Sequence, residues 1–281
     1  MFDCMLDNII RTAQKGAEVN PGDYEKDGLL HCCQCNTPKQ HRIKTPSGRD
    51  RIVPCMCACA SGRYDREREE EKKRREMEEI ERLRSSGIRL ALRGCTFDQA
   101  DPGKNKAQLD LAKRYAEHFS EMRENNTGLL LFGPPGNGKT FTAACIANDL
   151  VSRGIPVLMT TFPDIIRLAQ DLDSDEKLSY FRSLNRYDLL VVDDLGVERK
   201  TDFGYETVFS VIDQRYIAGK PLIVTTNLSR QELDHPGDTR YSRVYDRILE
   251  MSVPVEFSGE SIRPEKAKQK RDEMKQLLYG K

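Results

Sequence analysis

Residues 128–140 read Gly-Leu-Leu-Leu-Phe-Gly-Pro-Pro-Gly-Asn-Gly-Lys-Thr, and this stretch decides the fold. An apolar run, typical of a buried parallel strand, leads into a loop with three glycines that ends in Lys139-Thr140. This is a complete P-loop, in which backbone N–H groups can turn inward and cradle phosphates because no Cβ stands in the way. The residues expected to hold a nucleotide are Gly133, Pro134, Pro135, Gly136, Asn137, Gly138, Lys139 and Thr140.

The two residues that end the loop have separate expected roles. Lys139 would reach the β- and γ-phosphates, and Thr140 would give its hydroxyl to Mg²⁺. Apolar residues then recur at helical spacing, and Gly154 stands where a helix would end. The N-terminus of that helix would point its partial positive charge at the phosphates. A chance turn before an ordinary helix is the alternative, and it requires eight positions and their setting to agree by accident.

Polar residues end two further apolar runs. Residues 188–194 read as a buried strand that finishes with Asp193 and Asp194. Because this strand would end beside the P-loop, we expect Asp193 to hold the Mg²⁺ shell near Thr140 and Asp194 to polarise the attacking water. Residues 222–227 form another predicted strand, and Asn227 at its end can hydrogen-bond the γ-phosphate or the water.

The order of elements predicts an α/β P-loop fold of three layers with a parallel sheet. Further strands are predicted at 155–161 and 253–257, the latter at an edge where Pro254 is tolerated, and helices at 106–123 and 205–219. We place the ATPase domain at residues 85–265 because Ser85-Ser86-Gly87 would break the preceding helix. Residues 266–281 form a basic C-terminal tail.

Cysteines mark a separate N-terminal module at residues 1–62. Six of the nine cysteines fall between positions 32 and 59, which in a reducing cytosol favours metal over disulfides. Cys32-x-x-Cys35 is half of a zinc knuckle, and the second half follows after a long gap. We expect four of Cys32, Cys35, Cys55, Cys57 and Cys59 to bind one Zn²⁺; the choice among the last three is open, and His41 could replace one of them. Scattered free thiols in a loop are the alternative.

Composition limits the class of protein and of partner. The 281 residues are 38% hydrophobic and 32% charged, and 45 basic residues cancel 45 acidic ones. No global field therefore indicates a nucleic-acid or membrane partner. No apolar run approaches the roughly 18 residues of a membrane span, and no signal peptide begins the chain, so a cytoplasmic protein is expected. Residues 63–84 predict a solvated helical linker, because opposite charges lie three and four apart and apolar residues are too few for a coiled coil.

A basic helix is predicted near residue 245. Arg243 and Arg247 are four positions apart and therefore share one helical face. Two guanidinium groups on this face can project toward a phosphate on an adjacent subunit. The alternative is a solvated, salt-bridged face.

A set of motifs resembles the AAA+ ATPases of the DnaC/DnaI helicase-loader and IstB group over about residues 85–265. The set consists of Cys95-Thr96-Phe97-Asp98, the P-loop, Asp193-Asp194, Thr226-Asn227, and Arg243 and Arg247 with Arg263. The resemblance implies that Lys139 and Thr140 are the Walker A pair and that Asp193 and Asp194 are the Walker B pair. It also implies that Asn227 is sensor 1. Among the arginines, it implies that Arg247 is an arginine finger acting in trans with Arg243 as its neighbour, and that Arg263 is sensor 2. Two features depart from the pattern. Asp194 stands where many AAA+ proteins have Glu, and little sequence remains for the lid helix that normally carries sensor 2.

The resemblance also implies a function. Members of this group bind the replicative DnaB-type helicase and help to place it on single-stranded DNA, and the cysteine module loosely resembles the helicase-contact domain of DnaI-like loaders. We therefore expect an oligomeric, ATP-hydrolysing helicase loader that binds DNA without sequence preference. An IstB-type transposition helper, a small-molecule kinase and a zinc-organised adaptor without turnover are the alternatives. Basic residues such as Lys104, Lys106, Lys113 and Arg114 can follow a DNA backbone, but ordinary surface charge is the favoured explanation because no base-stacking aromatic residues lie nearby.

Overall fold

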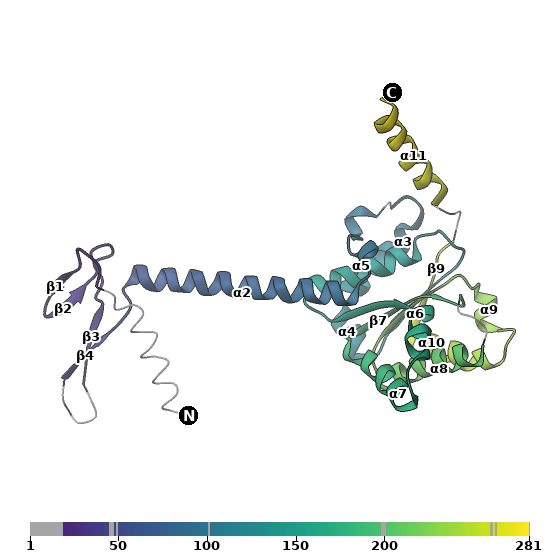
Figure 1. Cartoon of the computed structure of the whole chain (residues 1–281), viewed down its shortest axis with the longest axis horizontal. Coiled ribbons are helices and arrows are strands. Elements are labelled where there is room, and N and C mark those ends of the chain that lie inside the picture. The colour runs from purple at the N-terminus through teal and green to yellow at the C-terminus, as the bar shows by residue number, and fades with distance from the viewer. Residues whose placement is uncertain are drawn as a thin grey trace. The chain divides into compact units, whose positions relative to one another are not determined.

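The computed structural model describes residues 19–44, 48, 50–100, 102–197, 201–258, 261 and 263–280 of the chain. The chain divides into two compact units, Met1–Met77 and Glu78–Lys281. Figure 1 shows their helices and strands. Among the described residues, no helix combines the length and the apolar character needed to cross a bilayer.

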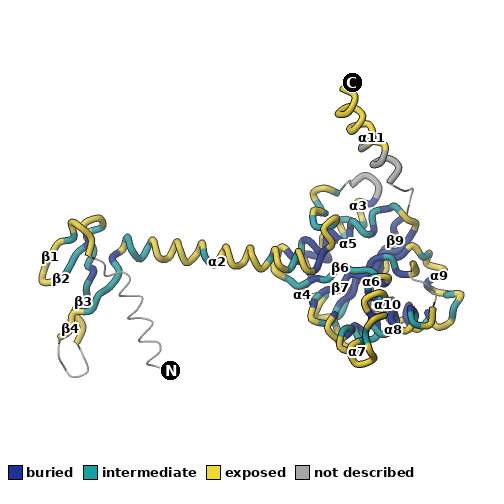
Figure 2. Tube along the Cα trace, in the orientation of Figure 1, coloured by how far each residue is buried: buried dark blue, intermediate teal, exposed yellow. Residues whose placement is uncertain are grey.

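The described strands of the first unit form two short hairpins. β1 (Tyr24–Lys26) pairs antiparallel with β2 (Leu29–His31), and β3 (Gln40–Lys44) pairs antiparallel with β4 (Asp50–Pro54). Most of their side chains are exposed, so these hairpins bury little apolar surface (Figure 2). Isolated hairpins of this length are marginally stable in water, so other interactions must hold them.

A single long helix, α2 (Ala58–Gly87), follows the hairpins. The predicted linker at 63–84 lies within it, and pairs such as Arg75 with Glu71 at 2.8 Å stabilise successive turns. The expected break at Ser85-Ser86-Gly87 was wrong in part. Both serines remain helical, their hydroxyls donate to the carbonyls of Arg82 and Leu83, and the helix ends only at Gly87.

The second unit contains the predicted parallel sheet. Its strands are β5 (Gly128–Phe132), β6 (Val157–Thr161), β7 (Leu189–Leu195), β8 (Leu222–Thr226) and β9 (Ser252–Glu256). Their order is β6-β7-β8-β5-β9, and every pairing is parallel. The strand that enters the P-loop, β5, is buried throughout, and β9 forms an edge as its proline predicted.

Helices cover both faces of the sheet and complete three layers. They are α3 (Pro102–Glu117), α4 (Phe119–Glu124), α5 (Lys139–Ser152), α6 (Phe162–Gln170), α7 (Ser174–Ser183), α8 (Asp202–Ile217), α9 (Arg230–Asp234) and α10 (Arg240–Met251), with short 3₁₀ turns at Leu90–Leu92, Phe97–Gln99 and Leu184–Arg186. After β9, α11 (Arg263–Tyr279) contributes no described residue to either core. Successive β5 residues alternate between two cores: Leu129 packs with residues of α3 and α5, and Leu130 packs with residues of α6, α8 and α10. The three central strands, β7, β8 and β5, are therefore buried on both faces, and Figure 2 shows them in dark blue.

The helix expected at 106–123 is in fact two helices. The backbone leaves helical geometry at His118 (φ −97°, ψ 23°), which separates α3 from α4. Phe119 directly after the break is 1% exposed, so the change of direction lets its ring enter the core. An apolar pattern continuous in sequence did not reveal this bend.

Candidate active site and metal centre

The P-loop joins β5 to the first turn of α5, where its glycines adopt conformations that other residues avoid. Gly133, Gly136 and Gly138 have φ of 125°, 86° and 91°. A Cβ at Gly133 would lie 2.2 Å from the carbonyl oxygen of Phe257, and one at Gly136 would lie 2.0 Å from Ser261 Oγ. Both left-handed backbone and close packing therefore require glycine at these two positions.

Lys139 lies inside this loop. Its side chain is buried, and Nζ donates to the carbonyl oxygens of Gly133 and Pro134, both at 2.7 Å. These bonds solvate an ammonium group that burial would otherwise destabilise. The positive charge is thus fixed beside the loop amides and the N-terminus of α5, where an anion would bind.

Thr140 and Asp193 meet as the sequence predicted. The Thr140 hydroxyl donates to Asp193 Oδ1 at 2.8 Å, and the Thr225 hydroxyl donates to the same oxygen at 2.5 Å. Thr225 was not among the predicted site residues. A threonine inside an apolar strand reads as an ordinary strand former, and only its position beside the strand of Asp193 could have revealed it.

A bulge places Asp194. In the pairing of β7 with β8, Val192 faces Val224 whereas Leu195 faces Thr226, so β7 carries one extra residue. Asp194 occupies the left-handed region with φ of 59°, and its N–H donates to Thr225 Oγ1 at 2.9 Å. Such bulges redirect side chains next to active sites. Here the bulge brings the Asp194 side chain into the wall of a cavity.

This cavity has a volume of ≈ 490 Å³, which is within the range of small-molecule sites. Its lining combines P-loop residues and the polar pair Asp194 and Asn227 with apolar side chains. The lining residues are Leu92, Ala100, Asn105, Leu109, Pro135, Gly136, Asn137, Gly138, Lys139, Thr140, Phe141, Thr142, Asp194 and Asn227. The predicted P-loop, the Asp194 carboxylate and the Asn227 amide thus line the same cavity.

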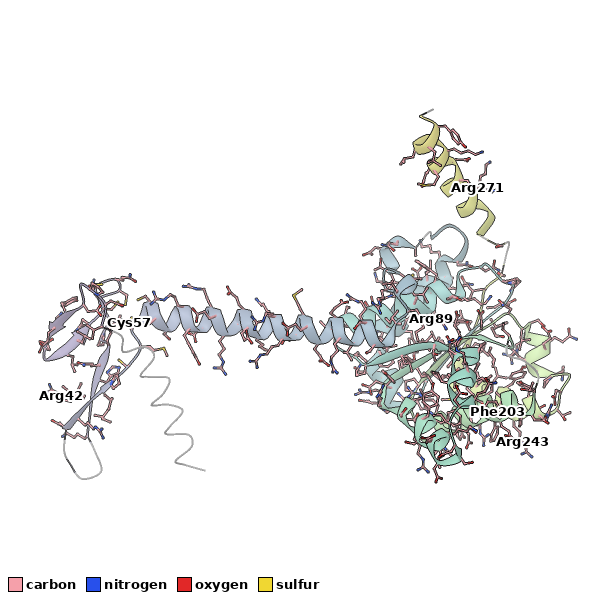
Figure 3. The ribbon with its side chains drawn as sticks, in the orientation of Figure 1. Arg42, Cys57, Arg89, Phe203, Arg243 and Arg271 are labelled. Carbon is pink, nitrogen blue, oxygen red and sulfur yellow. The ribbon has the colours of Figure 1, made fainter. Side chains whose placement is uncertain are left out.

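The predicted arginines lie elsewhere. Arg247 on α10 forms an ion pair with Asp213 at 2.7 Å, and its guanidinium lies 4.7 Å from the ring centroid of Phe209. Arg243, one turn earlier, is exposed and has no ion pair or hydrogen bond among the described residues (Figure 3). Neither residue lines the cavity of its own chain. Arg263 begins α11, and its side chain is outside the described residues.

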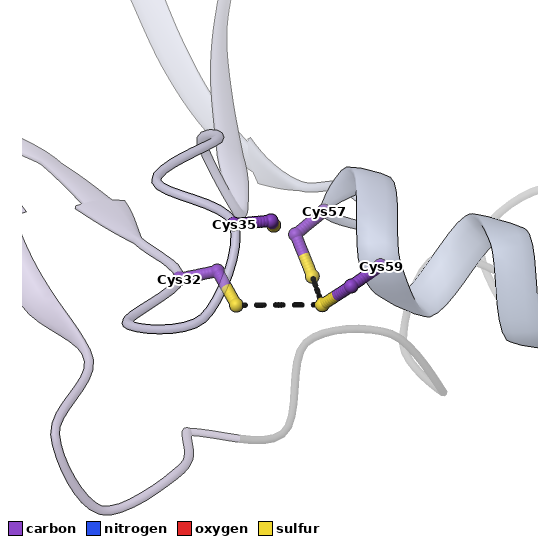
Figure 4. Close-up of side chains that lie close together, drawn as sticks. All are labelled: Cys32, Cys35, Cys57 and Cys59. Carbon is purple, nitrogen blue, oxygen red and sulfur yellow. Dashed lines mark hydrogen bonds between the residues drawn. The ribbon is translucent and has the colours of Figure 1, made fainter.

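Four thiols of the first unit come together in a second cluster (Figure 4). The sulfur atoms of Cys32, Cys35, Cys57 and Cys59 all lie within 4.8 Å of one another. The Cys32–Cys59 and Cys57–Cys59 sulfur distances are 3.6 and 3.3 Å. Four thiolates bound to zinc at about 2.3 Å in a tetrahedron would be about 3.8 Å apart. The cluster therefore has the donor type, number and spacing that suit Zn²⁺.

Two of the alternative ligands lie outside this cluster. Cys55 Sγ donates instead to the carbonyl oxygen of Pro38 at 3.4 Å, and His41 is exposed on β3. Thr37 helps to join the two halves, because its hydroxyl oxygen accepts from the N–H of Ala58 at the start of α2 and lies 3.0 Å from Cys35 Sγ. The second half is therefore Cys57-x-Cys59.

The thiols differ in proton affinity. The contact with Thr37 lowers the pKa of Cys35 to about 5. Hydrogen bonds to Cys57 and then Cys32 raise the pKa of Cys59 to about 12. Four thiolates cannot form side by side without a cation, because like charges at this spacing oppose ionisation. A bound divalent cation would remove that opposition.

Comparison with known proteins identifies relatives of the second unit. The family model described as IstB-like ATP binding protein matches residues 65–271. The replicative helicase loader DnaC of Escherichia coli (strain K12) is 31% identical over 186 residues, which cover 63% of this chain and 73% of that protein. The replicative helicase loader DnaI of Bacillus subtilis (strain 168) is 27% identical over 197 residues, which cover 64% of this chain and 62% of that protein.

Solved structures agree in fold. A crystal structure of the DnaC helicase loader superimposes with a TM-score of 0.51 at 25% identity, covering 60% of this chain and all 100% of that one. A crystal structure of DnaI gives a TM-score of 0.51 at 24% identity, covering 62% and 93% of the two chains. Both matches support the arrangement of the parallel sheet and its helices described above.

Proposed function

Because this chain belongs to the IstB-like ATP binding protein family and has the AAA+ P-loop fold, we propose that it hydrolyses ATP to load a replicative DnaB-type helicase onto single-stranded DNA. The observation that carries the enzymatic part is that Lys139, Thr140 and Asp194 line one cavity, while Asp193 accepts a hydrogen bond from Thr140. The loading role is supported by relatives named replicative helicase loaders.

The P-loop would hold the triphosphate. Its amides, the N-terminus of α5 and the buried Lys139 ammonium all present positive charge to the cavity. Thr140 and Asp193 would hold Mg²⁺, since their oxygens are 2.8 Å apart and Mg²⁺ prefers hard oxygen ligands. When bound, Mg²⁺ supplies charge neutralisation on the transferring phosphoryl group.

The remaining polar residues would act on water and the terminal phosphate. Asp194, which the β7 bulge holds in the cavity wall, would accept a hydrogen bond from an attacking water. Asn227 lines the same cavity and can hydrogen-bond the γ-phosphate or that water. Aspartate has a shorter side chain than the glutamate common in AAA+ proteins. The bulged backbone would therefore help the Asp194 carboxylate to reach the attacking water.

Hydrolysis would need a second subunit. Arg247 is the proposed arginine finger, Arg243 its neighbour, and both lie outside the cavity of their own chain. Arg263 is proposed as sensor 2. In related phosphoryl transfer an arginine finger is worth roughly 10³ to 10⁵ in rate. An isolated monomer should therefore be nearly idle, and assembly would switch hydrolysis on.

The N-terminal module, residues 1–62, is the proposed helicase contact. Zn²⁺ bound by Cys32, Cys35, Cys57 and Cys59 would hold hairpins too small to have their own apolar core. We propose that residues 63–84 link this module to the ATPase domain at 85–265, and that 266–281 form a basic tail. The family match begins at residue 65, so the module's role rests on its cysteine cluster.

Steady-state ATP hydrolysis, titrated with the replicative helicase and unstructured single-stranded DNA, tests this function. We expect low turnover alone and a large increase with both partners, abolished by Lys139→Ala. Helicase binding is measured in parallel by co-sedimentation. A protein that neither binds the helicase nor responds to it would refute the loading role.

A transposition helper is the second candidate, because the matching family model is itself described as IstB-like. Such a helper would load a transposase in place of a helicase. Pull-down of the full chain against a replicative helicase and against a transposase separates the two functions. We expect retention of the helicase alone.

A further inference from the structure

Asn148 is a buried asparagine of α5 that donates hydrogen bonds to a segment distant in the sequence. The residue is 6% exposed. Its Nδ2 donates to the backbone carbonyl oxygens of Leu92 at 2.7 Å and Cys95 at 3.0 Å. A third carbonyl oxygen, that of Ala144 one turn earlier in α5, lies at 2.9 Å from the same nitrogen. Because carbonyl oxygens only accept, the NH₂ group must face all three, which fixes the orientation of the amide.

The segment that receives these bonds has little regular structure of its own. Residues 90–100 contain two short 3₁₀ turns, at Leu90–Leu92 and Phe97–Gln99. Turns of this kind have few hydrogen bonds, and those have poor geometry, so the segment depends on tertiary contacts for its position. Leu92 and Cys95 pack against the apolar core to which α5 contributes, and Asn148 adds directed polar bonds at the same two residues. Asn148 thus ties this segment to α5.

The tied segment supplies part of the wall of the nucleotide cavity. Leu92 and Ala100 line the cavity together with Leu109 of α3. In the proposed function the P-loop holds the phosphates, which leaves the nucleoside as the part of ATP that needs other contacts. Apolar side chains are the usual partners of such rings in ligand sites. The nucleoside would therefore pack against the wall that contains Leu92 and Ala100.

One helix sets the distance between this wall and the phosphates. α5 begins with Lys139 and Thr140 at the P-loop, and it holds the wall through Asn148 about two turns later. Asn148 does not line the cavity itself, so any effect on a ligand must act through the segment that it holds.

We propose that Asn148 is a positioning residue that holds the Leu92–Ala100 wall against the nucleoside of ATP and so strengthens nucleotide binding without touching the ligand. The P-loop keeps its own grip on the phosphates, which does not depend on Asn148. This inference rests on the proposed ATP binding and adds the residue that aligns the two halves of the site.

Titration calorimetry of the full chain with Mg²⁺ tests the proposal by comparing ATP with inorganic tripolyphosphate, which carries the phosphates and lacks the nucleoside. Asn148→Ala removes both bonds to the wall, and we expect ATP affinity to fall roughly 10-fold. Tripolyphosphate affinity should stay at the parental value. A residue that only supported the fold would change the two affinities together or change neither.

Two further variants sharpen the comparison. Asn148→Leu fills the same space without a donor, so it should show the same selective loss of ATP affinity, and it serves if Asn148→Ala fails to fold. Asn185→Ala is the matched control, because Asn185 Nδ2 also donates to a backbone carbonyl, that of Gln214 at 3.2 Å, and the residue lies outside the cavity wall. The control should bind both ligands as the parent does.

Hydrogen exchange of the parent protein tests the wall without any variant. ATP should slow the exchange of backbone amides in residues 90–100, and tripolyphosphate should not, because only ATP brings a nucleoside to the wall.

The outcomes separate this inference from the function beneath it. Parental ATP affinity in a folded Asn148 variant, or an equal loss for ATP and tripolyphosphate, would overturn the role of Asn148. Equal protection of residues 90–100 by the two ligands would also overturn it, as would ATP binding without any binding of tripolyphosphate by the parent. Binding of neither ligand by the parent would instead refute the proposed function.

Discussion

Thr225 Oγ1 lies 2.5 Å from Asp193 Oδ1 and also accepts from the N–H of Asp194. One buried hydroxyl on β8 therefore fixes both carboxylate residues of β7, and the Thr140 hydroxyl approaches the same Asp193 oxygen from α5. This connected set of hydrogen bonds orients the proposed Mg²⁺ ligand and the bulge that carries Asp194. The geometry of this set depends on Thr225, a residue that has no proposed role in hydrolysis itself.

Thr225→Val should slow hydrolysis more than it weakens ATP binding. The isosteric change leaves the Asp194 N–H without its acceptor and Asp193 without one donor, which costs about 1 to 3 kcal/mol. We expect kcat to fall roughly 10-fold or more. Steady-state turnover at saturating helicase and DNA measures it. Thr225→Ser keeps the hydroxyl and is the control; equal rates for the two variants would contradict the account.

Metal content should depend on four cysteines and not on their neighbours. We expect roughly one zinc per purified chain. Serine in place of Cys32, Cys35, Cys57 or Cys59 removes one ligand and should release the metal, as measured by mass spectrometry of metals in the dialysed protein. Cys55→Ser and His41→Ala should retain it. Zinc lost from Cys55→Ser and kept by Cys57→Ser would show that the ligand set is wrong.

The fold was largely predictable because its signals are local. Apolar runs such as Leu129–Phe132 mark buried strands, and the glycines of the P-loop mark the phosphate cradle. Alternation of strands and helices then predicted the parallel sheet. The break at His118 escaped because it depends on where Phe119 enters the core.

The candidate site was predictable only where a characteristic residue type stands at a characteristic position in the sequence. Asp193 and Asp194 end an apolar strand after a P-loop, so their neighbourhood could be expected. The choice of Cys57 and Cys59 over Cys55 could not, because it depends on where α2 begins.

The arginines of α10 should act between subunits. Arg243→Ala and Arg247→Ala should each reduce hydrolysis in the assembled form while ATP binding persists, and Arg247→Ala by roughly 10³-fold or more. Asp213→Asn breaks the in-chain ion pair of Arg247 but keeps the guanidinium, so it should retain hydrolysis.

Mixing gives the direct test of action in trans. A preparation of Arg247→Ala subunits and one of Lys139→Ala subunits should each be inactive in an ATPase assay. Combined, they should recover activity, because an intact arginine can then meet an intact P-loop on the neighbouring subunit. No recovery in mixed assemblies of demonstrated composition would rule out a trans arginine.

Arg215 should stabilise the second unit without any part in hydrolysis. Its side chain is fully buried and donates to the carbonyl oxygens of Tyr187 and Asp188 and twice to that of Pro221, joining α8 to the starts of β7 and β8. Arg215→Gln leaves these buried carbonyl oxygens without their hydrogen-bond donors, and we expect a loss of about 3 to 5 kcal/mol in unfolding free energy.

Urea unfolding followed by circular dichroism measures this loss. Arg182→Gln on the exposed face of α7 is the matched control and should change stability by no more than about 0.5 kcal/mol. Similar midpoints for the two variants would mean that the buried guanidinium is dispensable.

ATP uptake at the P-loop is the claim on which the proposed hydrolysis and helicase loading depend. Equilibrium dialysis of the full chain against labelled ATP and Mg²⁺ tests it most directly. We expect about one ATP per chain for the parent and almost none for Lys139→Ala, because that ammonium is the buried charge of the loop. No uptake by the parent, or equal uptake by the two proteins, would contradict the account.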